Sequence, residues 1–415
     1  MVTFFNLFIT LFSFNFILSL HTLLYMNPEE LNIPRCKNFS GYKPCVSYEN
    51  CLKDGCKLDS SMTRIGKKIL IISLDAMGNV LYNTPILRAL KRKYKECTIY
   101  WITMPNAEKI LHNNNFIDRV FTWTDEHRMI LRQMDFDLLF NGDKSDYACA
   151  FANEINSKEK FGFLLNKDGK IIPANKGAMY SYNLGLDDEL KFRINQRSGI
   201  DILHEVFELE YQRDEYVFSF TLEEQEFIDK FKEHHKYEPE KFYVGFNTGC
   251  SNLFPNKKMT TDQHIFLISE LIKFDNIKVV LLGGKEDTER NLKIYDAFTQ
   301  EEKKKILYTP TNLGLRQGAA FVSLCDLVVT GDSFGMHLAI AQKKTIIVWF
   351  GVSCPAEIEL YGRGEKLIPQ GLSCHPCWKK SCPYNLECID MIDLNKIIDL
   401  VKKYSLLKTP RNINN

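Results

Sequence analysis

The sequence predicts an α/β protein with two doubly wound parallel sheets, one in each half of the chain. Short apolar runs alternate with segments of helical apolar spacing, which is the pattern of strand–helix–strand units. The chain has 415 residues, enough for two such domains with separate cores. Near the carboxyl end, residues 327–329, 334–342 and 345–350 are predicted as strand, helix and strand, joined by a polar turn.

The other elements follow from the same two periodicities. In the first half, strands are predicted at residues 69–74, 98–103, 118–122, 137–140 and 161–164, and helices at 80–94, 105–113 and 199–209. In the second half, strands are predicted at 242–247, 278–282 and 305–308, and helices at 222–235, 261–274, 287–298, 314–323 and 394–404. The predicted segments are an apolar stretch at 1–26, a cysteine-rich segment at 27–66, a first domain at 67–210, a crossing at 211–240, a second domain at 241–393, and a helix and tail at 394–415.

Nothing in the composition indicates a nucleic-acid binder. The net charge is +1, and the lysines are scattered among acidic residues rather than gathered in a basic arm.

Residues 1–26 contain no charged side chain and are nearly long enough to cross a bilayer. They also lack the basic start of a signal peptide, since Arg35 is the first cationic side chain. Three interpretations stay open: a membrane anchor, an uncleaved signal-like segment, or a chain that begins at Met26. Asn6 and Asn15 weaken the first of these.

The turn at residues 330–333 is a candidate anion site. It lies at the carboxyl end of a strand and the amino end of a helix, where free N–H groups and the helix dipole favour a phosphate or diphosphate. Gly331 gives the turn backbone freedom, and Asp332 and Ser333 are candidate N-caps. The alternative is a capped helix without a ligand.

Eight of the thirteen cysteines form two groups. The second group, Cys374, Cys377, Cys382 and Cys388, has the short spacing of a tetrahedral Zn or Fe site. The first group, Cys36, Cys45, Cys51 and Cys56, is more widely spaced. Two alternatives stay open: two disulfide pairs in each group, which would require an oxidising compartment, or a site that mixes ligands from both groups.

Four segments carry a family resemblance: ILIISLDAMGNVLYNTPILRAL, VGFNTGCSNLFPNKKMTTDQH, VVLLGGKEDTER and LVVTGDSFGMHLAIAQKKTIIVWFG. In this order and spacing, over about residues 67–400, the chain resembles glycosyltransferase family 9, the heptosyltransferases. The resemblance implies the GT-B fold, in which two Rossmann-like domains face each other across a cleft, the first for the acceptor and the second for the donor. It also implies inverting transfer of a heptose from an ADP-sugar without a catalytic metal, in the cytoplasm. A subgroup that modifies autotransporter proteins is similar in joining these domains to a four-cysteine iron site.

The resemblance also implies donor-binding residues. Asp332 matches the family aspartate that contacts the nucleotide-sugar, and Lys257 matches the lysine that holds its phosphate. The family pattern Asp-Thr-Gly-Pro-Met-His is altered here to Asp-Ser-Phe-Gly-Met-His. The altered turn includes Ser333 and Gly335, whereas Met336 and His337 keep their places. Either Glu286 or Glu289 takes the place of the ribose-binding carboxylate, and Thr248, Gly249 and Ser251 offer further donors to the anion.

The first loop departs from the family. Family members have an aspartate as the proposed base where this chain has Asn79, which cannot accept a proton at neutral pH. Asp75 is the nearest carboxylate and the predicted substitute base, and Asp143 is the next to test.

The predicted enzyme therefore transfers a heptose or similar sugar to a hydroxyl of a lipopolysaccharide, another glycan, a lipid-linked acceptor or a protein. The alternative is a weak or inactive relative that binds a nucleotide-sugar as a scaffold. The expected location is the cytoplasm, or the cytoplasmic face of the inner membrane if residues 1–26 associate with it.

Overall fold

The computed structural model describes residues 33–43, 45, 64–251 and 254–408. It divides into two compact units, Met1–Gly66 and Lys67–Asn415. In the first unit, Cys36 forms an isolated antiparallel bridge with Arg64. The predictions for residues 1–26, Cys51 and Cys56 lie outside the described residues. Within the described ranges, no helix has the length and apolarity needed to span a membrane.

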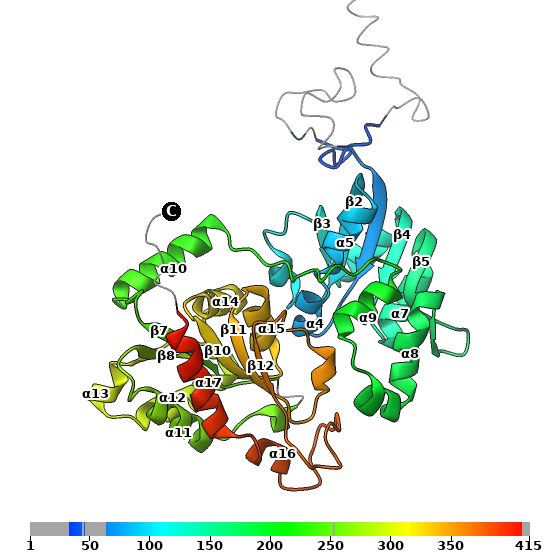
Figure 1. Ribbon diagram of the computed structural model, residues 1–415. Helices are drawn as coiled ribbons and strands as arrows, with labels where there is room; N and C mark the ends of the chain where they lie inside the picture. The colour runs from blue at the N-terminus through cyan, green and yellow to red at the C-terminus, as the bar shows by residue number, and fades with distance from the viewer. Residues whose placement is uncertain (1–32, 44, 46–63, 252–253, 409–415) are drawn as a thin grey trace, which may run out of the picture. The chain divides into compact units, whose positions relative to one another are not determined.

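The second unit begins with a six-stranded sheet (Figure 1). Its strands are β1 (Lys67–Ile72), β2 (Cys97–Thr103), β3 (Arg119–Thr122), β4 (Asp135–Asn141), β5 (Asn156–Leu165) and β6 (Ile171–Pro173). The order is β3-β2-β1-β4-β5-β6, and only β6 is antiparallel to its neighbour. The helices are α4 (Met77–Tyr82), α5 (Ile86–Lys93), α6 (Asp125–Gln133), α7 (Asp146–Glu154), α8 (Met179–Leu186) and α9 (Gly199–Val206).

A second six-stranded sheet follows, and all its pairs are parallel. Its strands are β7 (Phe242–Asn247), β8 (Ile277–Leu282), β9 (Ile306–Tyr308), β10 (Leu327–Gly331), β11 (Thr345–Trp349) and β12 (Gly364–Leu367), in the order β12-β11-β10-β7-β8-β9. The helices are α10 (Leu222–His234), α11 (Thr261–Leu271), α12 (Thr288–Asp296), α13 (Gln300–Lys303), α14 (Leu315–Ser323), α15 (Phe334–Ala341), α16 (Glu387–Asp390) and α17 (Leu394–Leu406). The terminal helix α17, red in Figure 1, packs against α11.

The predicted fold class, two doubly wound parallel sheets, is confirmed. The strands are apolar on both faces because helices cover both faces of a parallel sheet. In β1, Ile69 and Ile71 enter one core cluster while Leu70 and Ile72 enter another on the opposite face. The alternating faces of neighbouring strands therefore build two cores around each sheet.

Several predicted boundaries are wrong for local reasons. The helix expected at residues 80–94 is two helices, α4 and α5, because Pro85 has no N–H to continue the first. The helix expected at 105–113 is a single 3-10 turn, Glu108–Leu111. The hairpin partner β6 and the short edge strand β12 were not predicted, since neither has a clear apolar pattern.

The two sheets of this unit share one apolar core. Residues from both, such as Leu81 of α4 and Met336 of α15, belong to the same buried cluster. Gly78 lets α4 pack closely against His337 of α15, since a Cβ at this position would lie 2.8 Å from Cδ2 of His337. The hydroxyl of Tyr82 donates to the carbonyl of Glu357 at 3.3 Å. Helix α4, which follows the loop after β1, is therefore held against the first turn of α15.

Candidate active site

The site is built where β7 and β10 end side by side. Asn247, the last residue of β7, ties the two strand ends together. Its Nδ2 donates to the Thr330 hydroxyl at 3.0 Å, to the Ser333 hydroxyl at 2.9 Å and to the Gly249 carbonyl at 3.1 Å. Carboxyl ends of neighbouring parallel strands are where ligands bind in open α/β sheets.

A largely buried ion pair occupies this corner. Lys257 Nζ lies 2.6 Å from Asp332 Oδ2, and the two side chains are 12 % and 13 % exposed. Burial disfavours the Asp332 carboxylate, but Lys257 and His337 outweigh burial and hold the pKa of Asp332 below its ordinary value. The Lys257 carbonyl accepts from Trp349 Nε1 at 2.9 Å, which fixes the lysine against the end of β11. The two residues predicted to bind the donor are thus together, 75 positions apart in sequence.

The first turn of α15 faces this pair. Ser333 is its N-cap residue but makes no side-chain cap bond, because its hydroxyl accepts from Asn247. The free N–H groups of the helix start are therefore available to an anion. Gly335 is required for packing, since a Cβ there would lie 2.5 Å from the Asn247 amide carbon.

Met336 and His337 are both buried. The Met336 side chain belongs to the core shared by the two sheets. The Nδ1 of His337 lies 3.0 Å from the Tyr216 hydroxyl, and burial lowers the pKa of His337 to about 4, so the ring is neutral at pH 7. These two buried side chains support the first turn of α15 from the side of the core.

The loop after β7 and the turn after β8 form the other side of the site. The Thr248 hydroxyl donates to Asn291 within the protein, so this hydroxyl is already engaged, while Ser251 is exposed. Gly249 lies against the buried Asp287, whose Oδ1 is 3.6 Å from Lys258 Nζ. A Cβ on Gly249 would collide with that carboxylate.

Glu286 and Glu289 flank Asp287, and both are exposed. Asp287, which stands between the two predicted glutamates, was not predicted as a site residue.

Three predicted residues lie around the loop after β1: Asp75 in the loop, Asn79 in α4 and Asp143 after β4. Asp75 is exposed, and its Oδ2 accepts from the Tyr147 hydroxyl at 3.2 Å. The side chain of Asn79 donates to the Asp75 carbonyl at 3.3 Å. Asp143, after β4, accepts from the Leu74 N–H at 2.6 Å, and burial together with the charge of Asp75 raises the pKa of Asp143 to about 7. Two carboxyl groups with different environments therefore lie at the ends of neighbouring strands.

Three charged residues beside this loop were missed from sequence. Lys191 Nζ lies 3.7 Å from Glu357 Oε1, which links the first domain to the segment after β11. Burial raises the pKa of Glu357, against the opposing charge of Lys191. Burial and the neighbouring Lys191 lower the pKa of Lys144 to about 8. No motif marks these residues, because they meet only when the two sheets face each other.

The second cysteine group lies in the loop between β12 and α16 and, with Cys388, in α16 itself. All four cysteines are free thiols and line one small cavity of about 20 Å³. Burial, and then the neighbouring Cys377, Cys382 and Cys374, raise the pKa of the Cys388 thiol to about 11. Among the residues that the structure describes, no three His, Cys, Asp or Glu side chains are arranged to hold a metal ion. In the first group, Cys36 is partly exposed and Cys45 is exposed.

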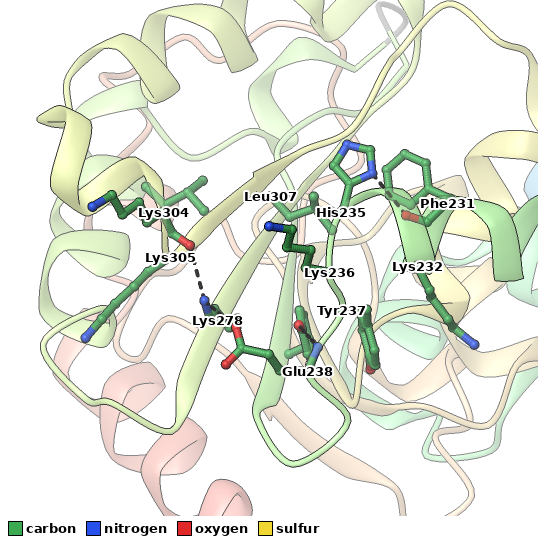
Figure 2. Close-up of a pocket in the computed structure, with 12 residues that line it drawn as sticks. Phe231, Lys232, His235, Lys236, Tyr237, Glu238, Lys278, Lys304, Lys305 and Leu307 are labelled. Atoms are coloured by element: carbon green, nitrogen blue, oxygen red, sulfur yellow. Dashed lines mark hydrogen bonds and ion pairs between the residues drawn. The ribbon is translucent and has the colours of Figure 1, made fainter.

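Another cavity, of about 190 Å³, lies elsewhere (Figure 2). It lies at the amino ends of β8 and β9, opposite the corner that holds Lys257. Lys278 in its wall is engaged within the protein, since it pairs with Glu238 at 2.8 Å and donates to the Lys304 carbonyl. This cavity is therefore separate from the site at the carboxyl ends.

Comparisons with known proteins agree with this architecture. Residues 126–387 match the model of glycosyltransferase family 9 (heptosyltransferase). The chain is 24 % identical to lipopolysaccharide heptosyltransferase 1 of Campylobacter coli, over 81 % of this chain and 98 % of that protein.

Two solved structures share the fold. One is a family 9 glycosyltransferase from Veillonella parvula, with a TM-score of 0.64 at 18 % identity, covering 82 % of this chain and 98 % of that one. The other is the ADP-heptose lipopolysaccharide heptosyltransferase II of E. coli, with a TM-score of 0.61 at 16 % identity, covering 82 % of this chain and 99 % of that one. The matched residues include β7 to β12 and the corner that holds Lys257 and Asp332, and the chain belongs to glycosyltransferase family 9, the heptosyltransferases.

Proposed function

We propose that this glycosyltransferase moves a heptose from an ADP-heptose donor to an acceptor hydroxyl, with inversion at the sugar carbon. The contact between Gly78 and His337 carries the proposal. It holds α4, which follows the loop that bears Asp75, against the helix α15 that starts at the corner of Lys257 and Asp332, so a base and a diphosphate site would face each other. Residues 67–210 then form the acceptor domain and residues 241–393 the donor domain.

The donor would lie across the ends of β8, β7 and β10. Lys257 and the first N–H groups of α15 would neutralise the diphosphate, whose charge grows as it leaves. Asp332 would accept a hydrogen bond from a sugar hydroxyl, and Glu286 or Glu289 would bind the ribose. Support for ADP comes from the E. coli enzyme of the same fold, which is described as an ADP-heptose transferase.

Asp75 would act as the base. It would take the proton of the acceptor hydroxyl while that oxygen attacks the anomeric carbon from the side opposite the diphosphate. The bond from the sugar to the diphosphate breaks, and ADP leaves with the electron pair. A single displacement of this kind inverts the carbon. Asp143, which accepts from the Leu74 N–H, would position the loop and keep its own proton at low pH.

The acceptor would enter from the first domain. Lys144 and Lys191, which lie near Glu357, favour an acceptor with acidic groups, as in a lipopolysaccharide core. The Campylobacter coli relative is named for lipopolysaccharide. Other glycan, lipid-linked and protein hydroxyls are the competing acceptors. Because nucleotide-sugars are cytoplasmic metabolites, we place the enzyme in the cytoplasm or at the cytoplasmic face of the inner membrane.

A structural metal is a second part of the proposal. Cys374, Cys377, Cys382 and Cys388 line one cavity and are the ligand types that Zn or Fe prefers, so binding would draw the thiolates together. The ion would order the loop, with no role in sugar transfer. Elemental analysis of reduced protein should find a metal that Cys377→Ser loses, with a lower Tm. Less than about a tenth of an equivalent in the wild type would contradict this proposal.

A panel of ADP- and UDP-sugars tests the main proposal. Purified protein should bind ADP and release it from ADP-heptose when an acceptor is present. Binding of ADP-heptose with no transfer to any acceptor, including lipopolysaccharide core, would favour a non-catalytic scaffold, the alternative raised by Asn79. Preference for UDP-sugars would overturn the assignment of the donor.

A further inference from the structure

We propose that Trp378 is the platform on which the transferred sugar of the donor stacks, and that the cysteine loop exists to carry it there. The inference rests on the proposed function, because it needs the diphosphate at Lys257. It adds a residue that determines which sugar is accepted.

The indole lies inside the site although its loop comes from far along the chain. The Lys257 ammonium is 4.9 Å from the centre of the Trp378 ring, and the Lys191 ammonium is 5.2 Å from it. The Phe254 ring lies beside it, with centroids 5.3 Å apart. Trp378 therefore contacts a cation of the donor domain and a cation of the acceptor domain.

Part of the Trp378 surface remains accessible to a ligand. Trp378 is 42 % exposed, whereas a tryptophan of a packed core is normally covered. An aromatic face that is exposed inside a cleft and flanked by polar groups is typical of a ligand-binding surface. The C–H faces of a pyranose are apolar and suit a flat aromatic surface. The ion pair of Lys191 with Glu357 adds polar groups near this surface, since Lys191 also contacts the ring.

The backbone of Trp378 has an unfavourable conformation that hydrogen bonds hold in place. Its φ is +51°, in the left-handed region that is unfavourable for a side chain of this size. The N–H groups of Cys377 and Trp378 both donate to the Val352 carbonyl, at 3.1 and 2.8 Å. A strained residue that is fixed by several bonds is a mark of a functional position.

Further bonds fix the loop from both domains. The amide of Asn256, next to Lys257, donates to the Lys379 carbonyl at 2.8 Å. From the first domain, Arg193 donates to the carbonyls of His375 and Ser373 at 2.8 and 2.7 Å. The position of Trp378 is therefore coupled to the phosphate lysine and to the acceptor domain.

The order of the strands identifies the part of the donor that reaches Trp378. The sheet runs β11-β10-β7-β8, with the ribose carboxylates after β8 and the diphosphate site at β7 and β10. Trp378 is bonded to Val352, just after β11, on the far side of the diphosphate from the ribose. The group that extends to this side is the sugar on the second phosphate, and the adenine points the other way.

The test compares ADP with ADP-heptose by calorimetry. In Trp378→Ala, the affinity for ADP-heptose should fall about tenfold, the size of one strong aromatic contact, while the affinity for ADP stays within about twofold. Trp378→Phe should recover most of the loss. Phe266→Ala, which removes an equally exposed aromatic (41 %) from α11, should change neither affinity.

Tryptophan fluorescence gives a second readout. ADP-heptose should change the emission of the wild type more than ADP does, and this difference should disappear in Trp378→Phe. Equal losses of ADP and ADP-heptose affinity, or no loss in either, would overturn the role of Trp378. Failure of the wild type to bind ADP at all would instead overturn the donor site and the inference with it.

Discussion

Replacing Lys257 by methionine should damage both stability and donor binding, and the two effects can be separated. The substitution keeps the length and apolar stem of the side chain but removes the charge that faces Asp332 at 2.6 Å. The Asp332 carboxylate would then be left without a cation while only 13 % exposed. An uncompensated buried charge costs about 3 kcal/mol at the low end of measured cases.

This loss should lower the Tm by roughly 6–12 °C, at 2–4 °C per kcal/mol for a domain of this size. The effect depends on pH in a known direction. The pKa of Asp332 in the folded protein is below its ordinary 3.8. The ion pair therefore contributes its full stability above pH 3.8, and this contribution is lost as the pH falls through the lower pKa of the folded state. The Tm difference between the wild type and Lys257→Met should therefore shrink in strong acid.

The double variant Lys257→Met with Asp332→Asn separates the two roles. It removes both charges, so most of the Tm should return. ADP affinity should stay low, by about 10- to 100-fold, because a charged hydrogen bond to phosphate is missing in both variants. Calorimetry and thermal unfolding of the two variants measure these effects. Wild-type ADP affinity in the double variant would refute the assignment of Lys257 to the diphosphate.

The remaining predictions concern Asp75 and Asn79 after β1 and the neighbouring Asp143 after β4. Asp75→Asn should lower the transfer rate by about 10²–10⁴ with unchanged ADP affinity, whereas Asn79→Asp should keep or raise the rate. A normal rate in Asp75→Asn, measured as ADP release, would eliminate Asp75 as the base. Asp143 has a folded pKa of about 7 against an ordinary 3.8, so its contribution to stability is complete below about pH 4 and is lost as the pH rises through 7. In Asp143→Asn the amide oxygen can still accept from the Leu74 N–H. This variant should therefore have a higher Tm than the wild type at pH 8 but not at pH 4. An equal change of Tm at both pH values would contradict the raised pKa of Asp143.

The fold was predictable because strands buried on both faces leave continuous apolar runs. The runs at β7 and β8 were predicted to within one residue and those at β1 and β10 to within two, since helices cover these strands from either side. The edge strand β12 has the sequence GEKL, which no pattern distinguishes from a loop. Edge strands are held by one neighbour, so their sequence is weakly constrained.

The site was predictable only where a motif spans it. Asp332 and Lys257 were named from two motifs, and the structure adds the contact between them. The second partner of Lys257, Trp378, lies in a segment noted only for its cysteines. Nothing local in that segment indicates that its N–H groups bond to Val352, because such contacts depend on the folding of the whole loop.

The most direct test of the whole account is ADP release from ADP-heptose by the purified protein, with and without lipopolysaccharide core acceptor. We expect release that depends on the acceptor, an inverted linkage in the product, and no comparable release of UDP from UDP-sugars. Transfer with retention of configuration, or turnover of UDP-sugars alone, would contradict it.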